Sequence, residues 1–381
     1  MLYLLTAFFV AAAVTLFVVR SSTRHGHLSA DHDLSGPQKF HARPVPRIGG
    51  VGIVAGVSIA ALLMYVTDRS RTELALLLLA GLPAFVVGLI EDFTKKVSPG
   101  KRLLATAISA VVGAVLLNAL IDRTDIPGLD WIVSFGVGAL IITVFGVAGV
   151  ANSINIIDGF NGLSSMCVSL MLLAFAYVAY QVGDNELALV ALVGVGAVMG
   201  FFVWNFPAGL IFLGDGGAYF MGFFLAEVGV LLISRHHEVS PLFGVMVCIY
   251  PVFETLFSIY RRRVLRDASP GQPDGIHLHS LIYRRLMRWA IGARDARAMT
   301  RRNSMTAPYL WTLCVFALMP ALLFWDSTPL IAGCMLLFSV GYVSLYWRIV
   351  RFKTPKWLVL RGSLRDVDES ALGKQSLGKP D

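Results

Sequence analysis

The chain has 381 residues, of which 56% are hydrophobic and 15% are charged, and its mean hydropathy is +0.70. A soluble globular domain with a polar surface does not reach these values, so the composition excludes that class. The formal net charge of +8 indicates anionic lipid and an anionic substrate. Nucleic acid is not expected as a partner, because the basic residues are spread along the chain and no nucleic-acid-binding module is visible.

Apolar stretches long enough to cross a hydrocarbon core of roughly 30 Å recur from one end of the chain to the other. The sequence predicts an all-α, polytopic integral membrane protein with about eleven spans, near residues 2–19, 48–66, 74–90, 103–120, 131–151, 162–182, 187–204, 210–233, 242–260, 307–325 and 329–347. No basic residue precedes the first span, which argues against a cleaved signal peptide and for a retained helix with a periplasmic N-terminus. Residues 1–347 are then a single transmembrane domain, and 348–381 a cytoplasmic, partly disordered tail.

The distribution of lysine and arginine fixes the orientation, because these residues accumulate in cytoplasmic loops. With a periplasmic N-terminus, the cytoplasmic segments are 20–47, 91–102, 152–161, 205–217, 261–306 and 348–381. They hold 5, 4, 0, 0, 11 and 8 of the 32 basic residues, which leaves four outside: Arg69, Arg71, Arg123 and Arg235. The C-terminus is therefore predicted to be cytoplasmic. In the basic loop 261–306, apolar residues alternate with arginine over 281–297, a pattern consistent with a helix lying on the inner leaflet.

A zinc site and a disulfide framework are not expected. The four cysteines lie inside predicted spans without CxxC spacing and are interpreted as small core residues: Cys167, Cys248, Cys314 and Cys334. The basic loop contains His277 and His279, but Asp274 is the one further ligand type nearby, which is too few for zinc. The two imidazoles are instead interpreted as cationic or hydrogen-bonding groups for a diphosphate.

Carboxylates gather at the predicted cytoplasmic ends of the spans, among glycine, asparagine and apolar residues: Glu91, Asp92, Asp158 and Asp215. Ionisable groups at membrane depth are costly and are functional candidates, although a carboxylate at a helix end also serves as a solvated cap. Four of them on one face, each within a compact motif, favour a functional site.

Each carboxylate has a distinct setting. Glu91 and Asp92 close the third span, and neighbouring helical residues point about 100° apart, so one can bind a metal while the other acts as a base. In the segment 152–163, Asn152 and Asn155 share a helical face beside Asp158. Asp215 is flanked by glycines before a helix, which suits a metal ligand beside a diphosphate held by backbone N–H groups.

The acidic cluster and the basic loop together predict a divalent cation. Carboxylates alone would repel a nucleotide diphosphate, whereas a hard cation held by Asp and Asn oxygens bridges the two, as is common in phosphoryl transfer. Mg²⁺ is the expected ion, with Mn²⁺ as an alternative.

Read in order, these motifs resemble the polyprenyl-phosphate N-acetylhexosamine-1-phosphate transferases, of the glycosyltransferase family 4 type. This family includes the enterobacterial-antigen and teichoic-acid initiating enzymes and the peptidoglycan translocase. The resemblance covers roughly residues 39–285 and rests on five segments: 39–50 (K-x-H-x-x-P-x-P-R-x-G-G), the pair at 91–92, 152–163 (N-x-x-N-x-x-D-G-x-[DN]-G-L), 214–218 (G-D-x-G-[SA]) and 277–280 (H-x-H-H). Residues 251–256 are similar to the family's P-x-x-D-T-L segment, with Glu254 in place of aspartate.

The resemblance implies transfer of an N-acetylhexosamine-1-phosphate, GlcNAc-1-phosphate first of all, from a UDP-sugar to undecaprenyl phosphate, with release of UMP. It implies a bacterial inner-membrane enzyme whose catalytic site faces the cytoplasm, with membrane lipids and a second copy of the chain, in a homodimer, as further partners. The implied catalytic residues are Asp92, Glu91 and Asp158, and the implied metal ligands are Asp215 and Asp158. The implied substrate-binding residues are Lys39, His41, Arg47, Lys101, Asn152, Asn155, Asn161, His277 and His279.

Three positions depart from the family pattern: Glu91 replaces its first aspartate, Ser280 its last histidine, and Gly275 an arginine. Glu91 keeps the carboxylate, so activity is still expected. Together with Asn161 and the eleventh span, Ser280 and Gly275 favour an enzyme that initiates O-antigen or capsule synthesis. The alternatives are a peptidoglycan-type phospho-sugar-peptide translocase and, from a different class, an inactive lipid-binding or transport relative. A transporter is disfavoured because it typically binds ions near the midplane between inverted repeats.

Overall fold

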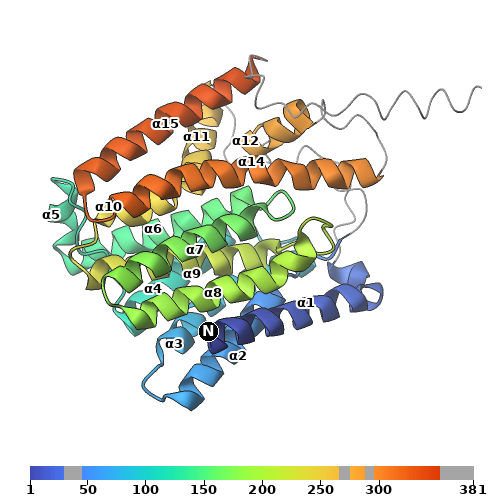
Figure 1. Cartoon of the computed structure of the whole chain (residues 1–381), viewed down its shortest axis with the longest axis horizontal. Helices are drawn as coiled ribbons and strands as arrows, with labels where there is room; N and C mark the ends of the chain where they lie inside the picture. The colour runs from blue at the N-terminus through green and yellow to red at the C-terminus, as the bar shows by residue number, and fades with distance from the viewer. Residues whose placement is uncertain (30–44, 266–274, 288–295, 352–381) are drawn as a thin grey trace, which may run out of the picture.

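The structure is a computed structural model that describes residues 1–29, 45–265, 275–287 and 296–351. Within these ranges the regular elements are helices, which confirms the predicted all-α class (Figure 1). The long helices run side by side across Figure 1, with α1–α3 at one edge of the bundle and α14 and α15 at the other. Their bounds are α1 Leu2–Ser29, α2 Gly50–Thr67, α3 Glu73–Thr94, α4 Pro99–Leu117, α5 Leu129–Val133, α6 Gly136–Ile157, α7 Leu163–Gln181, α8 Asn185–Asn205, α9 Gly214–Arg235, α10 Pro241–Val247, α11 Ile249–Leu265, α12 Leu278–Leu281, η1 Ile282–Met287, α14 Ala296–Leu323 and α15 Thr328–Val350.

The predicted number of spans is confirmed, with one change in shape. Within the described residues, 10 helices are long and apolar enough to cross a membrane, or 11 if the bent pair α10 and α11 counts as one span. The segment predicted as a span over 242–260 is broken into α10 and α11, which meet at 75°. Pro251 explains the break: it lacks the N–H that would donate to the carbonyl of Val247, and its ring would clash with that carbonyl.

Two other helices begin away from their predicted starts. The sixth helix begins at Gly136, after the separate short helix α5, and α14 begins at Ala296, before its predicted start near 307. The first turns of α14 contain Arg297, Arg301 and Arg302. Hydropathy detects only the lipid-crossing part of a helix, so polar turns that continue it beyond the membrane are missed.

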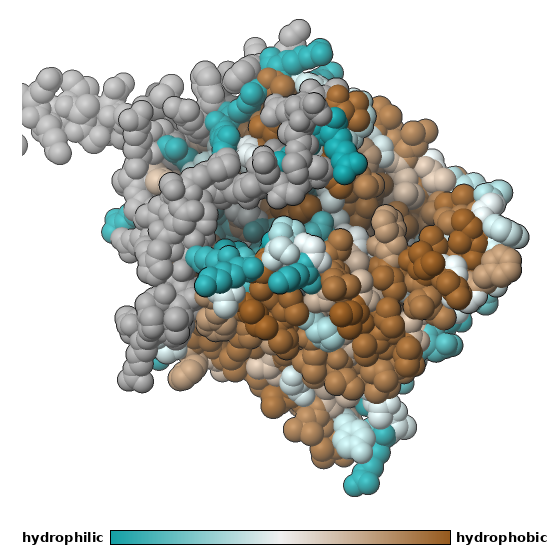
Figure 2. All heavy atoms as spheres, turned by 180° about the vertical axis from the view of Figure 1, so that it is seen from behind, coloured by the Kyte–Doolittle hydropathy of each residue, from teal (hydrophilic) through white to brown (hydrophobic). Residues whose placement is uncertain are grey.

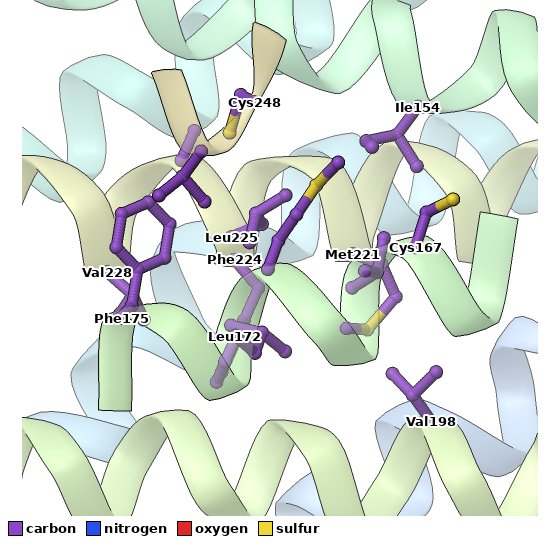
Figure 3. Packing of buried hydrophobic residues seen from close by; sticks show 14 of the residues in the cluster. Ile154, Cys167, Leu172, Phe175, Val198, Met221, Phe224, Leu225, Val228 and Cys248 are labelled. Carbon is purple, nitrogen blue, oxygen red and sulfur yellow. The ribbon is translucent and has the colours of Figure 1, made fainter. Parts of the chain in front are cut away.

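The central helix of the bundle is α9. Its whole apolar stretch is buried, and it packs against α2, α3, α4, α6, α7, α8 and α10. A helix that is apolar on all sides is suited to this central position. Figure 3 shows Met221, Phe224, Leu225 and Val228 of α9 among residues of the surrounding helices, including Phe175 of α7.

The outer surface of the bundle is apolar, as lipid requires. Hydrophobic residues cover a broad part of the face in Figure 2, and hydrophilic residues lie at its margins and in one group near the centre. Large apolar side chains are exposed on many helices, among them Phe17, Val115, Phe145, Phe316 and Leu337. The protein is an integral membrane protein. Three of the four cysteines are buried, as predicted for core residues, whereas Cys334 is only partly buried.

Loops that were predicted to share the outer side of the membrane do meet. Arg235 pairs with Glu73 at 2.8 Å, His236 Nε2 lies 3.1 Å from Asp184 Oδ2, and Thr328 donates to Asp125 at 2.6 Å. These contacts join the 68–73, 118–130, 183–185, 235–240 and 324–328 regions at one end of the bundle.

The amphipathic segment 281–297 does not lie on lipid where the structure describes it. Leu281, Ile282, Leu286 and Met287 are buried inside the protein, where η1 packs against α14. The apolar residues of this segment therefore fill the protein core; residues 288–295 lie outside the described ranges.

Candidate active site

The N-terminus of α9 is held by a carboxylate from α3. The backbone N–H groups of Asp215 and Gly216 donate to the two carboxylate oxygens of Asp92, at 2.8 and 2.9 Å. The first N–H groups of a helix have no partner within it, so a carboxylate there satisfies them and complements the helix dipole. Asp92, which is 1% exposed, therefore fixes the start of α9 against the end of α3.

Glycines let the backbone close around this point. Gly214 has a φ of +76°, and a Cβ on it would lie 1.9 Å from the carbonyl oxygen of Arg47 and 2.6 Å from Asp92 Oδ2. Gly88 and Gly216 allow α3 to touch α9, since a Cβ on Gly88 would lie 2.6 Å from the Cα of Gly216. Side chains at these positions would push the segments of the site apart.

We expect Gly214→Ala to destabilise the fold by about 2 kcal/mol or more, because a left-handed conformation costs an L-residue roughly 1–2 kcal/mol and the added methyl group also clashes with Arg47. Thermal unfolding of the detergent-solubilised protein measures the loss. Gly149→Ala is the matched control, since Gly149 lies in α6 with open space around its Cα. Equal unfolding temperatures for the two variants would contradict the expectation.

Two arginines converge on Asp215. The Nη2 atom of Arg47 lies 3.3 Å from Asp215 Oδ1, and Arg102 pairs with Asp215 Oδ2. The side chain of Asp215 is 8% exposed, whereas that of Arg47 is 28% exposed. The guanidinium groups thus contact the buried carboxylate, and the partly exposed Arg47 also reaches solvent. In this position they can bind an anion with several oxygens.

Tyr219 connects this cluster to α6. The guanidinium carbon of Arg102 lies 6.0 Å from the centroid of the Tyr219 ring. The Tyr219 hydroxyl donates to Asn152 Oδ1 at 3.4 Å, and Asn155 Nδ2 donates to that hydroxyl at 3.5 Å. The predicted common face of Asn152 and Asn155 is confirmed, because both amides meet one hydroxyl group.

Asp158 lies just beyond the end of α6, on the same side. Its Oδ1 accepts a hydrogen bond from the Ser164 hydroxyl at 2.5 Å. Burial of the carboxyl group raises the pKa of Asp158 to about 6, and the negative charge of Asp215 adds to this, while the Ser164 hydroxyl and the positive charge of Arg47 lower it. The charges of Asp215 and Arg47 therefore both act on Asp158.

The histidine segment borders the Asp158 loop. The rings of His277 and His279 stack with centroids 5.1 Å apart, and the His279 ring meets the edge of Phe160 at 5.3 Å. A Cβ on Gly159 would lie 3.5 Å from His279 Nε2. The structure thus places both histidines, which are distant in sequence, beside the loop that contains Asp158.

Asn161 faces the protein rather than the open side of the site. Its Nδ2 donates to the carbonyl of Pro207 at 3.3 Å and to the Ser304 hydroxyl at 3.1 Å, and its backbone N–H donates to Asn303 Oδ1 at 2.8 Å. The side chain is occupied in fixing the loop to α14, and this position does not support the predicted contact with substrate.

Two other predicted residues form no hydrogen bond or ion pair with Asp215 or Asp158 within the described ranges, and two more lie outside those ranges. Glu91 Oε2 accepts from the backbone N–H of Val97 at 2.6 Å, so this carboxylate closes the turn after α3. Lys101 is exposed on α4. Lys39 and His41 lie outside the described residues.

Sequence reasoning missed Arg102 and Tyr219. The helical phase of α4 is the signal for Arg102, because Thr106, Ser109 and Gly113 at +4, +7 and +11 are all buried, which places Arg102 on the inner face in preference to Lys101. Tyr219 follows Asp215 by four residues and so lies on the same face of α9.

No three or more His, Cys, Asp or Glu side chains in the described ranges are grouped to hold a metal ion. Asp215 and Asp158 nevertheless supply carboxylate oxygens, and Asn152 and Asn155 supply amide oxygens, which hard cations prefer. Proteins commonly bind Mg²⁺ through one or two carboxylates together with substrate phosphates and water, without a complete protein cage. The donor set therefore fits Mg²⁺ if the ion displaces a guanidinium group from Asp215.

The sequence profile of glycosyl transferase family 4 matches residues 74–233. A probable undecaprenyl-phosphate N-acetylglucosaminyl 1-phosphate transferase of Bacillus subtilis (strain 168) is 26% identical over 302 residues, which cover 77% of this chain and 80% of the relative. An undecaprenyl-phosphate alpha-N-acetylglucosaminyl 1-phosphate transferase of Thermotoga maritima is 28% identical over 255 residues, 66% of this chain and 72% of the relative.

A phospho-N-acetylmuramoyl-pentapeptide-transferase of Streptococcus pneumoniae (strain CGSP14) is 29% identical over 216 residues, 55% of this chain; the chain spans 64% of that relative's length, just under two thirds. The segment matched by the family profile runs from α3 to α9 and contains Asp92, Arg102, Asp158 and Asp215. Through this segment, which builds most of the polar cluster, the chain matches glycosyl transferase family 4.

Proposed function

We propose that this protein transfers GlcNAc-1-phosphate from UDP-GlcNAc to undecaprenyl phosphate, releases UMP, and thereby begins a lipid-linked polysaccharide of the cell envelope. The observation that carries the proposal is the convergence of Arg47 and Arg102 on Asp215 at the N-terminus of α9, beside Asp158 and the histidine segment. The names of the Bacillus and Thermotoga relatives, which match the larger shares of this chain, support this choice of donor and acceptor.

The site suits two anionic substrates. Guanidinium groups bind phosphate oxygens in pairs. Arg47 and Arg102 would bind the phosphates, and His277 and His279 would approach the diphosphate from the opposite side. Asn152, Asn155 and Tyr219 would line the site between these charges, where their hydrogen-bonding groups can orient the nucleotide.

In the reaction, an oxygen of the lipid phosphate ends bonded to the phosphorus that carries the sugar. The bond from this phosphorus to the bridging oxygen breaks, and its electron pair leaves on UMP. Negative charge develops on both flanking oxygens, so the residues of this chain act by positioning and by stabilising that charge. Asp92 keeps the N-terminus of α9 in place, and Arg47 and Arg102 face the transferred group.

Mg²⁺ is the proposed cofactor, with Asp215 and Asp158 as the residues that would hold it. When bound, the ion would neutralise phosphate charge and act as a Lewis acid on the phosphoryl oxygens.

The site is proposed to face the cytoplasm of a bacterial inner membrane, since the polar cluster joins the loops rich in lysine and arginine. We expect a cysteine at Ser98 to react with a membrane-impermeant thiol reagent only in inside-out vesicles, and a cysteine at Ser70 only in right-side-out cells. Both positions are exposed, and a variant with the native cysteines replaced by alanine provides the background. The opposite labelling pattern would show that the protein has the opposite orientation in the membrane.

UMP release by the purified protein, supplied with undecaprenyl phosphate and Mg²⁺, tests the function. UDP-GlcNAc is expected to be the best donor, and omission of the lipid phosphate is expected to stop the reaction. UDP-MurNAc-pentapeptide is the second donor to test, because the Streptococcus relative is named for that substrate. UMP release from UDP-MurNAc-pentapeptide alone would favour a peptidoglycan-type translocase over the proposed function. No UMP release from any UDP-sugar would favour a binding or transport role.

A further inference from the structure

The histidine segment is held by a fully buried carboxylate. Glu254 of α11 is 0% exposed. Its Oε1 accepts from the backbone N–H of Leu278 at 3.2 Å and lies 2.9 Å from Nδ1 of His277, while its Oε2 accepts from the hydroxyl of Tyr342 at 2.5 Å. Three groups thus meet at one carboxylate, which directs Nδ1 of His277 towards Glu254 and leaves Nε2 on the other side of the ring.

A second tyrosine of α15 holds the preceding residue. The Tyr346 hydroxyl donates to the carbonyl of Ile276 at 3.2 Å, and Nη1 of Arg261 donates to that carbonyl at 3.1 Å and to the Tyr346 hydroxyl at 2.7 Å. The guanidinium carbon of Arg261 also lies 5.1 Å from the centroid of the Tyr346 ring. The backbone before His277 is therefore fixed from the same two helices, α11 and α15, that provide Glu254 and Tyr342.

Although α15 lies at the periphery of the bundle, two of its few buried side chains bind the network around the histidine segment. It is the least buried of the spans in the described ranges, and its buried residues are Ile331, Tyr342, Tyr346 and Ile349. Tyr342 and Tyr346 are one helical turn apart, and each places its hydroxyl on the network around the histidine segment. From the other direction, Arg285 of η1 donates to the carbonyl of Ile349 at 2.8 Å. Two of the buried side chains of α15 thus join this network, while the helix also packs against α10 and α14.

We propose that Tyr342 and Tyr346 are positioning residues that act through Glu254 and the Ile276 carbonyl to hold the His277 imidazole against the diphosphate of the nucleotide substrate. The last span is thereby part of the catalytic apparatus, although it lies outside the segment matched by the family profile. The role assigned to His277 rests on the proposed function.

Tyr342→Phe removes the hydroxyl and keeps the ring, so the helix packing is retained. Its kcat/KM for UDP-GlcNAc is expected to fall at least about tenfold, the effect of losing a hydrogen bond to a charged group, while KM for undecaprenyl phosphate is unchanged. Tyr250→Phe is the matched control: Tyr250 is 0% exposed, and its hydroxyl has no hydrogen-bond partner among the described residues. Equal effects of the two substitutions would overturn the proposal.

A double-mutant cycle separates positioning from general destabilisation. In a His277→Ala background, Tyr342→Phe is expected to cause little further loss of kcat/KM, because the residue through which it acts is gone. A further loss of the same tenfold size would show that Tyr342 acts independently of His277 and would overturn the proposal.

Hydrogen exchange provides a readout that needs no turnover. The amide of Leu278 is expected to exchange faster in Tyr342→Phe and in Glu254→Gln than in Tyr250→Phe; equal rates would overturn the positioning role. If the wild-type protein released no UMP while this exchange pattern held, the proposed function would fail and the structural link from α15 to the histidine segment would stand.

Discussion

Replacing Asp215 by asparagine is expected to lower kcat for UMP release by about a hundredfold or more, the scale reported when an electrostatic partner of the reacting group is removed. Asp215 is the carboxylate on which Arg47 and Arg102 converge. The neutral amide leaves both guanidinium groups without their anion, so they lose the position from which they face the phosphates. It is also a poorer ligand for a hard cation, so the dependence of the rate on Mg²⁺ concentration is expected to weaken.

The measurement is UMP release at a series of Mg²⁺ concentrations, with thermal unfolding recorded alongside. Asp68→Asn is the control: Asp68 pairs with Arg71 at 3.2 Å in a loop where both side chains are about 40% exposed, and such surface pairs contribute little. A wild-type rate and an unchanged Mg²⁺ response in Asp215→Asn would remove Asp215 from the proposed site.

Asp92→Asn is expected to lower both the unfolding temperature and turnover. Both carboxylate oxygens of Asp92 accept backbone N–H groups of α9, whereas asparagine has one oxygen and would place its amide nitrogen against an N–H donor. Leaving a buried donor unsatisfied costs roughly 1–3 kcal/mol. Turnover falls because the start of α9, which includes Asp215, is no longer fixed against α3.

This expectation differs from the hypothesis drawn from the sequence, in which Asp92 is a catalytic residue and acts as a base. That hypothesis predicts lost turnover with unchanged stability and unchanged UDP-GlcNAc binding. Thermal unfolding, calorimetric titration with UDP-GlcNAc and UMP release therefore distinguish the two roles. Glu91→Gln is the control, since glutamine keeps an oxygen that accepts from Val97, and its unfolding temperature is expected to remain near that of the wild type.

Some features of the site depend on contacts between distant segments, which a local pattern does not show. Asn161 belongs to a dense polar motif, but it bonds to residues more than 40 positions away, and no local pattern indicates which neighbour satisfies a buried amide. The role of Arg102 depends on which side of α4 faces α9. The break near Cys248 was readable from Pro251, but hydropathy averaged over a window does not register a single proline.

The sequence by itself determined the fold class, the number of spans and the grouping of the loops on two sides. It did so because lipid as a solvent leaves few solutions: long apolar segments must become helices that satisfy their own backbone, and polar segments must leave the bilayer. It also made Asp92, Asp158 and Asp215 candidate site residues, since charged residues at membrane depth are rare enough to be informative. Tertiary structure alone decided what each carboxylate binds. A hydrogen bond or ion pair needs a donor and an acceptor atom about 3 Å apart, and here the two atoms belong to helices that are far apart in the chain. It placed Asp92 against the backbone of α9, Asp215 between two arginines, and Glu254 in contact with both His277 and Tyr342 of the last helix.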